Sequence, residues 1–231
     1  ENEDEVSEAF EAGVDDFLVK PVNVRTLRAR LRAARHYVQL LEAWERDRAQ
    51  LKQFAAELAI SNRRLAYAAM TDLLTNLPNR RSGMNALAKA WAASSRFEQP
   101  LSVMMLDIDH FKRINDGHGH AVGDTVLRDV ARAIQQSARK DDSVCRMGGE
   151  EFLVICSNTD LKAAIQAAER LRRMVERLRI QAGDAEIQTS VSIGVATREV
   201  GMTETDALVN AADRALYRAK HAGRNRSCVV V

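Results

Sequence analysis

This sequence lacks the features that anchor a protein in a membrane or cross-link its chain through disulfide bonds. No apolar run among its 231 residues is long enough to cross a bilayer, and its acidic start is the opposite of a secretion signal. Its three cysteines, Cys145, Cys156 and Cys228, lack the spacing of a metal site, which favours reduced core thiols over a disulfide framework. We therefore expect a cytoplasmic protein without a membrane partner.

The chain also lacks an excess of charge of one sign. Its 34 basic and 32 acidic residues give a formal net charge of +2, which provides no overall attraction to nucleic acid. Hydrophobic residues make up 46% of the chain, enough for a substantial core. The chain begins with Glu1 rather than Met, so we expect a fragment of a longer protein.

Glycine and proline are absent between Asn23 and about Met70, which predicts one long helix. Apolar residues recur in it at heptad spacing, with a three-residue step from Leu41 to Trp44 that is typical of a stammer in a coiled coil. About 45 residues at a rise of 1.5 Å would span roughly 70 Å, which argues against packing on the same domain. The pattern predicts a parallel dimeric stalk.

Five arginines between residues 25 and 35 give the start of this helix a second interpretation. Basic residues ahead of leucine heptads are typical of a basic-zipper DNA-binding protein. Leu27 and Leu31, however, continue the apolar stripe through the basic run, so this segment is also a packing face. We therefore predict no nucleic-acid partner.

Polar turn residues and Pro78 end the long helix and predict a domain boundary near Thr71. Beyond it, the patterns predict helices near 82–95, 109–116, 121–139, 160–179 and 204–221, with strands at 101–107, 187–197 and 227–231 and a hairpin at 143–156. This order favours an α+β domain in which one mixed sheet carries helices. Before the stalk, we predict a short helix that ends at Gly13 and a strand from Asp16 to Val19.

Acidic residues follow a segment that is predicted to form a buried strand. The apolar run at 101–106 ends in Asp107-Ile108-Asp109, and acids at the carboxyl end of a central strand are well placed to hold a cation. Mg²⁺ prefers oxygen ligands and keeps water and phosphate ligands, so Asp107 and the Ile108 carbonyl suit it. For Asp109 we favour a simpler role, the capping of the next helix.

The predicted hairpin has two glycines and two glutamates at its turn. Gly148-Gly149 permits the positive φ angles of a tight turn, and Glu150 and Glu151 follow directly. Taken alone, this pattern fits an ordinary hairpin with solvated glutamates. A metal or phosphate site requires that the turn meet Asp107.

Several blocks in order together resemble the GGDEF domain of diguanylate cyclases. They are residues 107–116, 119–120, 123–124, 146–152, 192–196 and 215–225, and the similarity covers residues 71–231. The resemblance implies a nucleotide-cyclase-like, ferredoxin-like palm with a central sheet flanked by helices. It also implies an enzyme that condenses two GTP into cyclic di-GMP and releases two pyrophosphates. The motif here reads GGEEF.

The resemblance implies roles for the acidic and glycine residues. Asp107, Glu150 and the Ile108 carbonyl would hold Mg²⁺, with Mn²⁺ as the alternative, against the triphosphate. Glu150 or Glu151 would help to deprotonate the ribose 3′-hydroxyl. Gly148-Gly149 would leave room for the incoming nucleotide, because no Cβ intervenes.

The resemblance also implies which residues bind the substrate. Lys112, Lys220 and Arg224 would bind phosphates. Asn115 and Asp124 would recognise the base, since a carboxylate accepts both N1–H and N2–H of guanine, whereas adenine presents an acceptor at N1. The expected substrate is therefore GTP.

Arg139-Lys140-Asp141-Asp142 matches the RxxD product-inhibition site of the same family. Arg139 and Asp142 would bind cyclic di-GMP, with Arg170 as a second contact. A charged loop at a helix end is the alternative interpretation. The matched spacing favours feedback inhibition.

Residues 9–22 resemble the last helix, strand and Lys-Pro turn of a response-regulator receiver domain. The expected organisation is a receiver remnant over 1–22, the stalk over 23–70 and a cyclase domain over 71–231. Each cyclase domain would bind one GTP, so catalysis needs a homodimer. The competing hypothesis is an inactive module that senses GTP or cyclic di-GMP, although its acidic site residues are intact.

Overall fold

The computed structural model describes residues 3–18, 20–183 and 185–229. It contains two compact units, Glu1–Arg63 and Arg64–Val231, whose boundary falls within helix α2 (Val24–Met70). No helix in the described ranges combines the length and apolar composition needed to cross a membrane. The long N-terminal helix expected from the sequence is confirmed, and the Asn23 side chain caps it by accepting the Arg25 N–H at 2.9 Å.

The first unit begins with helix α1 (Glu3–Glu11), followed by an irregular segment. The Phe10 and Phe17 rings meet edge to face with centroids 5.7 Å apart, and Arg30 forms an ion pair with Asp16. The strand predicted from Asp16 to Val19 is wrong for residues 16–18, which are irregular, and Val19 lies outside the described residues. A strand needs neighbouring backbone partners, and the described part of this unit supplies no second strand.

The second unit is a sheet domain. Its elements in chain order are α3 (Arg80–Phe97), β1 (Leu101–Ile108), α4 (Phe111–His118), α5 (His120–Ser137), β2 (Ser143–Gly148), β3 (Glu151–Ser157), α6 (Leu161–Glu176), β4 (Ile180–Ala182), β5 (Ala185–Ile187), β6 (Val191–Thr197), α7 (Thr205–His221) and β7 (Ser227–Val229). The main sheet has the order β2-β3-β1-β6-β7, with β6 and β7 parallel and the other neighbours antiparallel. The expected α+β architecture with a mixed sheet is confirmed.

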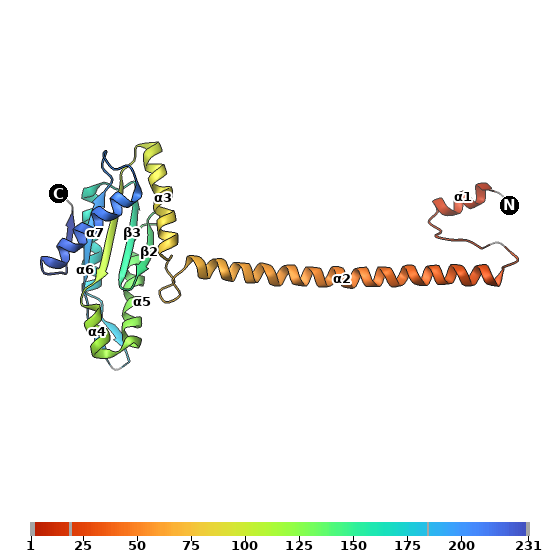
Figure 1. The fold of residues 1–231 in the computed structure, drawn as a ribbon, viewed down its shortest axis with the longest axis horizontal. Helices are drawn as coiled ribbons and strands as arrows, with labels where there is room; N and C mark the ends of the chain where they lie inside the picture. Colours follow the sequence, from red (N-terminus) through yellow and green to blue (C-terminus); the bar gives the residue numbers. More distant parts are fainter. Residues whose placement is uncertain (1–2, 19, 184, 230–231) are drawn as a thin grey trace. The chain divides into compact units, whose positions relative to one another are not determined.

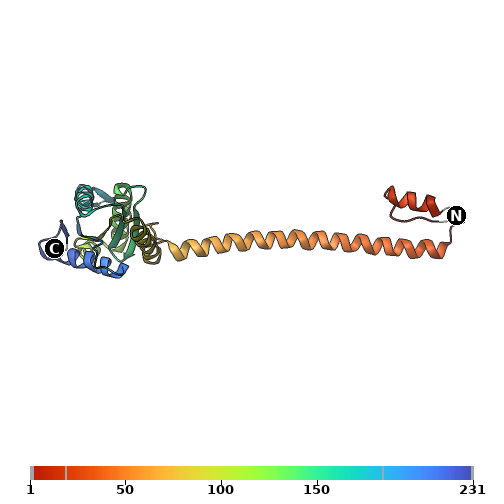
Figure 2. The same ribbon diagram turned by 90° about the horizontal axis from the view of Figure 1, so that it is seen from above.

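Helices cover both faces of this sheet, as Figures 1 and 2 show. Every residue of the central strand β1 is buried, and its alternating side chains enter two separate hydrophobic clusters. Met104 and Leu106 pack in the cluster that contains α5 and α6, whereas Val103 and Met105 pack in the cluster that contains α3 and α7. The carboxyl end of β1 is thereby held rigidly at one edge of the core.

The strand predicted over 187–197 is divided in two. Residues 185–187 form β5, which pairs with β4 as a separate ribbon, and the main sheet resumes only at Val191. Between them, the Thr189 hydroxyl donates to the Asp109 carbonyl at 3.4 Å, and the Ser190 hydroxyl donates to the Asp109 carboxylate at 2.6 Å. These tertiary hydrogen bonds interrupt the pattern that the sequence presents as continuous.

Candidate active site

The carboxyl end of β1 lies beside the glycine turn. Antiparallel pairing of β1 with β3 sets Asp107 opposite Glu151, and the Ile108 N–H donates to the Glu150 carbonyl at 3.3 Å. The carboxyl end of β1 therefore lies next to the hairpin turn, although Asp107 is far in the chain from Glu150 and Glu151.

The turn between β2 and β3 depends on its glycines. Gly148 has φ 144° and Gly149 has φ 53°, a region that side chains disfavour. Among the described residues, no atom outside the glycine and its two chain neighbours lies within 4 Å of the position that a Cβ would occupy at Gly148 or Gly149. Arg146 fixes the turn from below, because its Nε and Nη2 donate to the Gly149 carbonyl at 3.0 and 2.6 Å. The turn therefore offers an open backbone surface next to the acids.

The acids are electrostatically coupled. Asp107 is only 6% exposed, and Lys220 Nζ at the end of α7 lies 2.7 Å from its Oδ2. Burial raises the pKa of the Asp107 carboxyl to about 6; Lys220 opposes this rise, and the charges of Glu150 and Glu151 add to it. A positive charge near these carboxylates would favour the ionised form of Asp107.

Within the described residues, no three His, Cys, Asp or Glu side chains form a ready metal-binding group. The set expected from the sequence is smaller, with the carboxylates of Asp107 and Glu150 and the carbonyl of Ile108. Such a set fits Mg²⁺, which keeps water and substrate phosphates among its ligands.

The α4–α5 corner brings the two expected base-binding residues together. The Asn115 side chain lies directly over Gly123, where a Cβ would approach its Oδ1 to 1.9 Å. Asp124 follows Gly123 on α5 and is half-buried. Gly123 therefore lets the Asn115 amide lie close to the backbone that carries Asp124. Lys112 is exposed in the first turn of α4.

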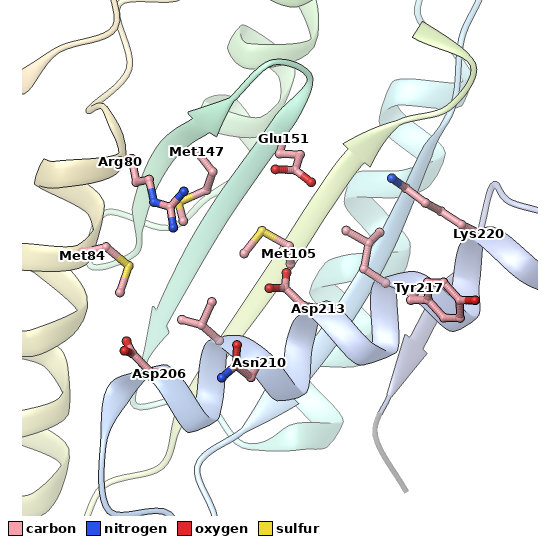
Figure 3. A pocket seen from close by; sticks show the side chains of 12 residues that line it. Arg80, Met84, Met105, Met147, Glu151, Asp206, Asn210, Asp213, Tyr217 and Lys220 are labelled. Atoms are coloured by element: carbon pink, nitrogen blue, oxygen red, sulfur yellow. The ribbon is translucent and has the colours of Figure 1, made fainter. Parts of the chain in front are cut away.

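A cavity of about 430 Å³ opens beside Glu151 and Lys220 (Figure 3). Methionine side chains line it together with Arg80 and Asp213, and Asp213 lies beside Met105 in Figure 3. Burial raises the pKa of Asp213, and the charge of Arg80 opposes that rise. Glu151 and Lys220 therefore border open space next to residues of α3 and α7.

Two of the expected product-inhibition residues, Arg139 and Asp142, form a tight turn after α5. Asp142 accepts the Arg139 N–H at 2.8 Å and returns its own N–H to the Arg139 carbonyl at 3.1 Å, which closes a tight turn. Burial raises the pKa of Cys156 to about 12, and the charges of Asp142, Arg139 and Arg170 all act on it. Arg170, on α6, lines a different cavity from the one that Arg139 and Asp142 line, so the structure does not show these three residues in contact.

Arg146 and Asp72 form an ion pair that the sequence did not predict. Arg146 Nη1 lies 2.9 Å from Asp72 Oδ1, and the Arg146 N–H donates to the Pro78 carbonyl at 2.9 Å. Burial tends to raise the pKa of Asp72, but hydrogen bonds from Thr75 and Arg146 outweigh it, so the pKa lies below its usual value. Arg146 therefore connects the segment after α2 to the glycine turn. The Arg146-Met147-Gly148-Gly149 block was visible in the sequence, but the partner was not.

The capping role expected for Asp109 is wrong. The residue before α4 is His110, which has φ 57° and makes no side-chain capping bond in the described part of the chain. Asp109 is 4% exposed, and its carboxylate accepts hydrogen bonds from Ser190 and Ser192 at 2.6 Å each. It points into the interior because Ser190 and Ser192, at the start of β6, supply hydroxyl donors there. Arg224 is exposed and has φ 61° in the loop after α7.

Known proteins are similar to this chain in sequence and fold. The family described as "Diguanylate cyclase, GGDEF domain" matches residues 69–226. The chain is 39% identical over 174 residues to Diguanylate cyclase A of Treponema denticola, and the aligned region covers 74% of this chain and 47% of that protein. It is 34% identical over 219 residues to Response regulator PleD of Caulobacter vibrioides, and the aligned region covers 94% of this chain and 45% of that protein. The chain thus spans about half the length of these curated relatives.

A solved structure shows a similar fold. It is described as the coiled coil and GGDEF domain of DgcB from Caulobacter crescentus in complex with c-di-GMP. The match has a TM-score of 0.70 and 30% sequence identity, and it covers 88% of this chain and 98% of that one.

Proposed function

Because this chain belongs to the GGDEF family of diguanylate cyclases, we propose that it condenses two GTP into cyclic di-GMP and releases two pyrophosphates. Each ribose 3′-oxygen attacks the α-phosphorus of the other nucleotide, and pyrophosphate leaves. The observation that carries this proposal is the meeting of Asp107 with the Gly148–Glu151 turn, next to Lys220. Relatives named diguanylate cyclases support it.

The acidic cluster has the composition that a divalent cation requires. Burial and two neighbouring carboxylates already raise the pKa of Asp107, so a cation would relieve an unfavourable concentration of negative charge. We assign Mg²⁺, with Mn²⁺ as the alternative, to Asp107, Glu150 and the Ile108 carbonyl. When bound, the ion would stabilise the charge that develops on the α-phosphate and on the leaving pyrophosphate.

The chain's own residues supply proton transfer and phosphate binding. Glu150 or Glu151 accepts the proton of the 3′-hydroxyl at the mouth of the turn. Lys112, Lys220 and Arg224 bind the triphosphate. The contact of 2.7 Å between Lys220 and Asp107 supports this role, because it holds the ammonium at the reacting edge.

Guanine is bound at the α4–α5 corner. Asp124 accepts N1–H and N2–H of the base, and the Asn115 amide supplies a further hydrogen bond. The close approach of Asn115 to Gly123 supports a fixed position for that amide. Adenine lacks the N2 amine and presents an acceptor at N1, so Asp124 discriminates against ATP.

The active assembly is a homodimer, because two nucleotides must react with each other. Helix α2 is the parallel stalk that joins the two copies, and the domain assignment is 1–22, 23–70 and 71–231. The match to a response regulator over 94% of this chain supports a receiver remnant before the stalk. Phosphorylation of a receiver would shift the stalk and align the two cyclase domains.

Arg139, Asp142 and Arg170 bind cyclic di-GMP and inhibit the enzyme. The hydrogen bonds between Arg139 and Asp142 support this proposal for that pair, because they fix the turn beside an open cavity, and Arg170 would contribute from a separate face of the domain. Product bound there would restrain the domains and slow turnover.

Incubation with GTP and Mg²⁺, followed by chromatography of the products, tests the proposed activity. We expect cyclic di-GMP to form with GTP, but no cyclic product with ATP or with a chelator. Retention of GTP without turnover would instead support a sensor module and contradict the enzyme assignment. A chain that neither bound nor converted GTP would contradict both.

A further inference from the structure

The Asp109 carboxylate joins three separate segments of the domain. It accepts hydrogen bonds from the Ser190 and Ser192 hydroxyls at 2.6 Å each and from the Asn225 backbone N–H at 3.0 Å. Its own N–H donates to the Ser190 carbonyl at 2.9 Å. One buried acid therefore ties the end of β1 to the start of β6 and to the loop between α7 and β7.

That loop has an unfavourable backbone conformation. Arg224 and Asn225 have φ angles of 61° and 45°, although neither is glycine. Such residues persist where the surroundings over-determine them. The Asn225 side chain is also fixed, because its Nδ2 donates to Glu176 at 2.6 Å and its Oδ1 accepts from Arg172 at 2.6 Å. Asn225 is thus held through both its backbone and its side chain.

The two aspartates at the end of β1 hold successive parts of the same segment. Asp107 pairs with Lys220 in the last turn of α7, and Asp109 receives the N–H of Asn225 a few residues later. Arg224 lies between these two anchor points, and its N–H donates to the Ala219 carbonyl at 3.0 Å. A shift of the β1 end would therefore move both anchors together.

We propose that Asp109 and Asn225 are positioning residues that fix Arg224 relative to Asp107 and its ion-pair partner Lys220. This inference rests on the proposed function, in which Lys220 and Arg224 bind phosphates. Asp109 is not among the substrate contacts; it acts through the loop that carries Arg224. Catalysis depends on geometry at the scale of an ångström, so a loop that relaxes would lower turnover while the domain stays folded.

The substitution Asp109→Asn tests this role in the full chain. The amide keeps the shape but loses the charge and one acceptor oxygen, so the Asn225 N–H loses its partner or competes for it. We expect the turnover number to fall about tenfold to a hundredfold, with a smaller change in KM. Ser190→Ala is the milder variant, since it removes one donor from the rim of the network, and we expect a loss of a few-fold.

Asp160→Ala is the matched control. Asp160 caps α6 by accepting the Ala163 N–H at 2.7 Å, so this substitution also removes a structural carboxylate. We expect a lower melting temperature for the control but an unchanged turnover number. If the control lost as much activity as Asp109→Asn at a similar melting temperature, general destabilisation would explain both, and the positioning role would be wrong.

A double-mutant cycle with Arg224→Ala separates positioning from a structural role. If Asp109 acts through Arg224, the double variant should have a kcat/KM within about twofold of Arg224→Ala alone. Losses that multiply would overturn the inference. If Asp109→Asn does not fold, Ser190→Ala takes its place in the cycle, with the same expectation.

Failure of the proposed function is a separate outcome. If the unmodified chain forms no cyclic di-GMP, the enzyme assignment fails, and the cycle is measured as affinity for GTP with Mg²⁺. The positioning role then predicts that both single variants weaken binding and that the double variant is no weaker than Arg224→Ala. No binding by the unmodified chain, or additive losses, would overturn the positioning role itself.

Discussion

Apolar residues have opposite fates in the stalk helix and in the sheet domain. No residue of α2, which the structure describes in full, is buried, and Leu51 and Leu58 are 73% and 63% exposed. In the sheet domain, the strands and helices bury their apolar residues in two clusters on opposite faces of the sheet. Regularly spaced apolar residues are therefore buried within the chain in the sheet domain, whereas those of α2 are left exposed.

This difference indicates which properties belong to one copy of the chain and which need a partner. The domain has its own core, so its fold and its acidic cluster belong to a single copy. A helix with an exposed apolar stripe gains stability by burying it against another chain. Substitutions in the two regions should therefore have separable effects on chemistry and on assembly.

The largest effect should come from the domain, with Glu150→Gln. Removal of this charge from the proposed metal site should lower turnover by about a thousandfold or more. Melting temperature and oligomeric state should stay the same, because Glu150 lies in a surface turn. Radiolabelled GTP turnover and sedimentation velocity measure the two properties, with the exposed Glu199→Gln as control. Normal turnover in Glu150→Gln would refute the metal assignment.

The next effect should come from the stalk, with Leu51→Glu and Leu58→Glu combined. Two charges in the apolar stripe should convert the proposed dimer to monomers, because buried unpaired carboxylates are costly. We expect a loss of turnover of about tenfold to a hundredfold at low protein concentration, with partial recovery at high concentration as the domains meet by diffusion.

Lys52→Glu with Ala59→Glu is the control for the stalk variant, since it places two carboxylates at the same spacing one position further along the helix. This control should remain dimeric and active. A monomeric wild-type chain with full activity would remove the contrast between the two regions, because the stalk would then have no role in assembly.

A smaller effect is expected at the turn formed by Arg139 and Asp142. Arg139→Ala removes a guanidinium that would bind the product, so we expect the concentration of cyclic di-GMP that halves the rate to rise at least tenfold. The uninhibited rate should not change. Lys140→Ala is the neighbouring control, and inhibition that persists unchanged in Arg139→Ala would exclude this site.

The sequence predicted the parts of the molecule that depend on local patterns. The order of strands and helices followed from periodicity, and Asp107 was singled out because it ends a strongly apolar run. The Gly148–Glu151 turn was recognisable from its paired glycines and glutamates, and the resemblance to the GGDEF domain linked it to Asp107. The division of the 187–197 segment was missed, because the donors of Ser190 and Ser192 bind a residue more than 80 positions earlier. No local pattern reveals such a partner.

The same limit explains the roles of Asp109 and Asp72. Asp109 precedes a helix, so the local rule favoured capping, yet its partners lie on β6 and in the loop after α7. Asp72 stands 74 positions from Arg146 and occurs in a polar turn that the sequence marked only as a boundary. In both cases, tertiary contacts decided the role of a residue whose local sequence suggested another.

The smallest effect should occur at Asp72, which lies just after the stalk helix. Asp72→Asn keeps the shape but removes the charge that pairs with Arg146, whose side chain is 12% exposed. We expect a loss of about 1–2 kcal/mol in the free energy of unfolding at pH 7, measured with urea. Thr75→Ala is the control, because it removes a neutral hydrogen bond to the same carboxylate.

The pH dependence of that loss distinguishes the ion pair from simple packing. The pKa of Asp72 is lower in the folded chain than its usual value of 3.8, so its stabilising contribution is complete above that value and disappears as the pH falls through the lowered pKa. The stability of wild type and Asp72→Asn should therefore converge below pH 3.8. A difference that stayed constant would mean that the charge on Asp72 contributes nothing.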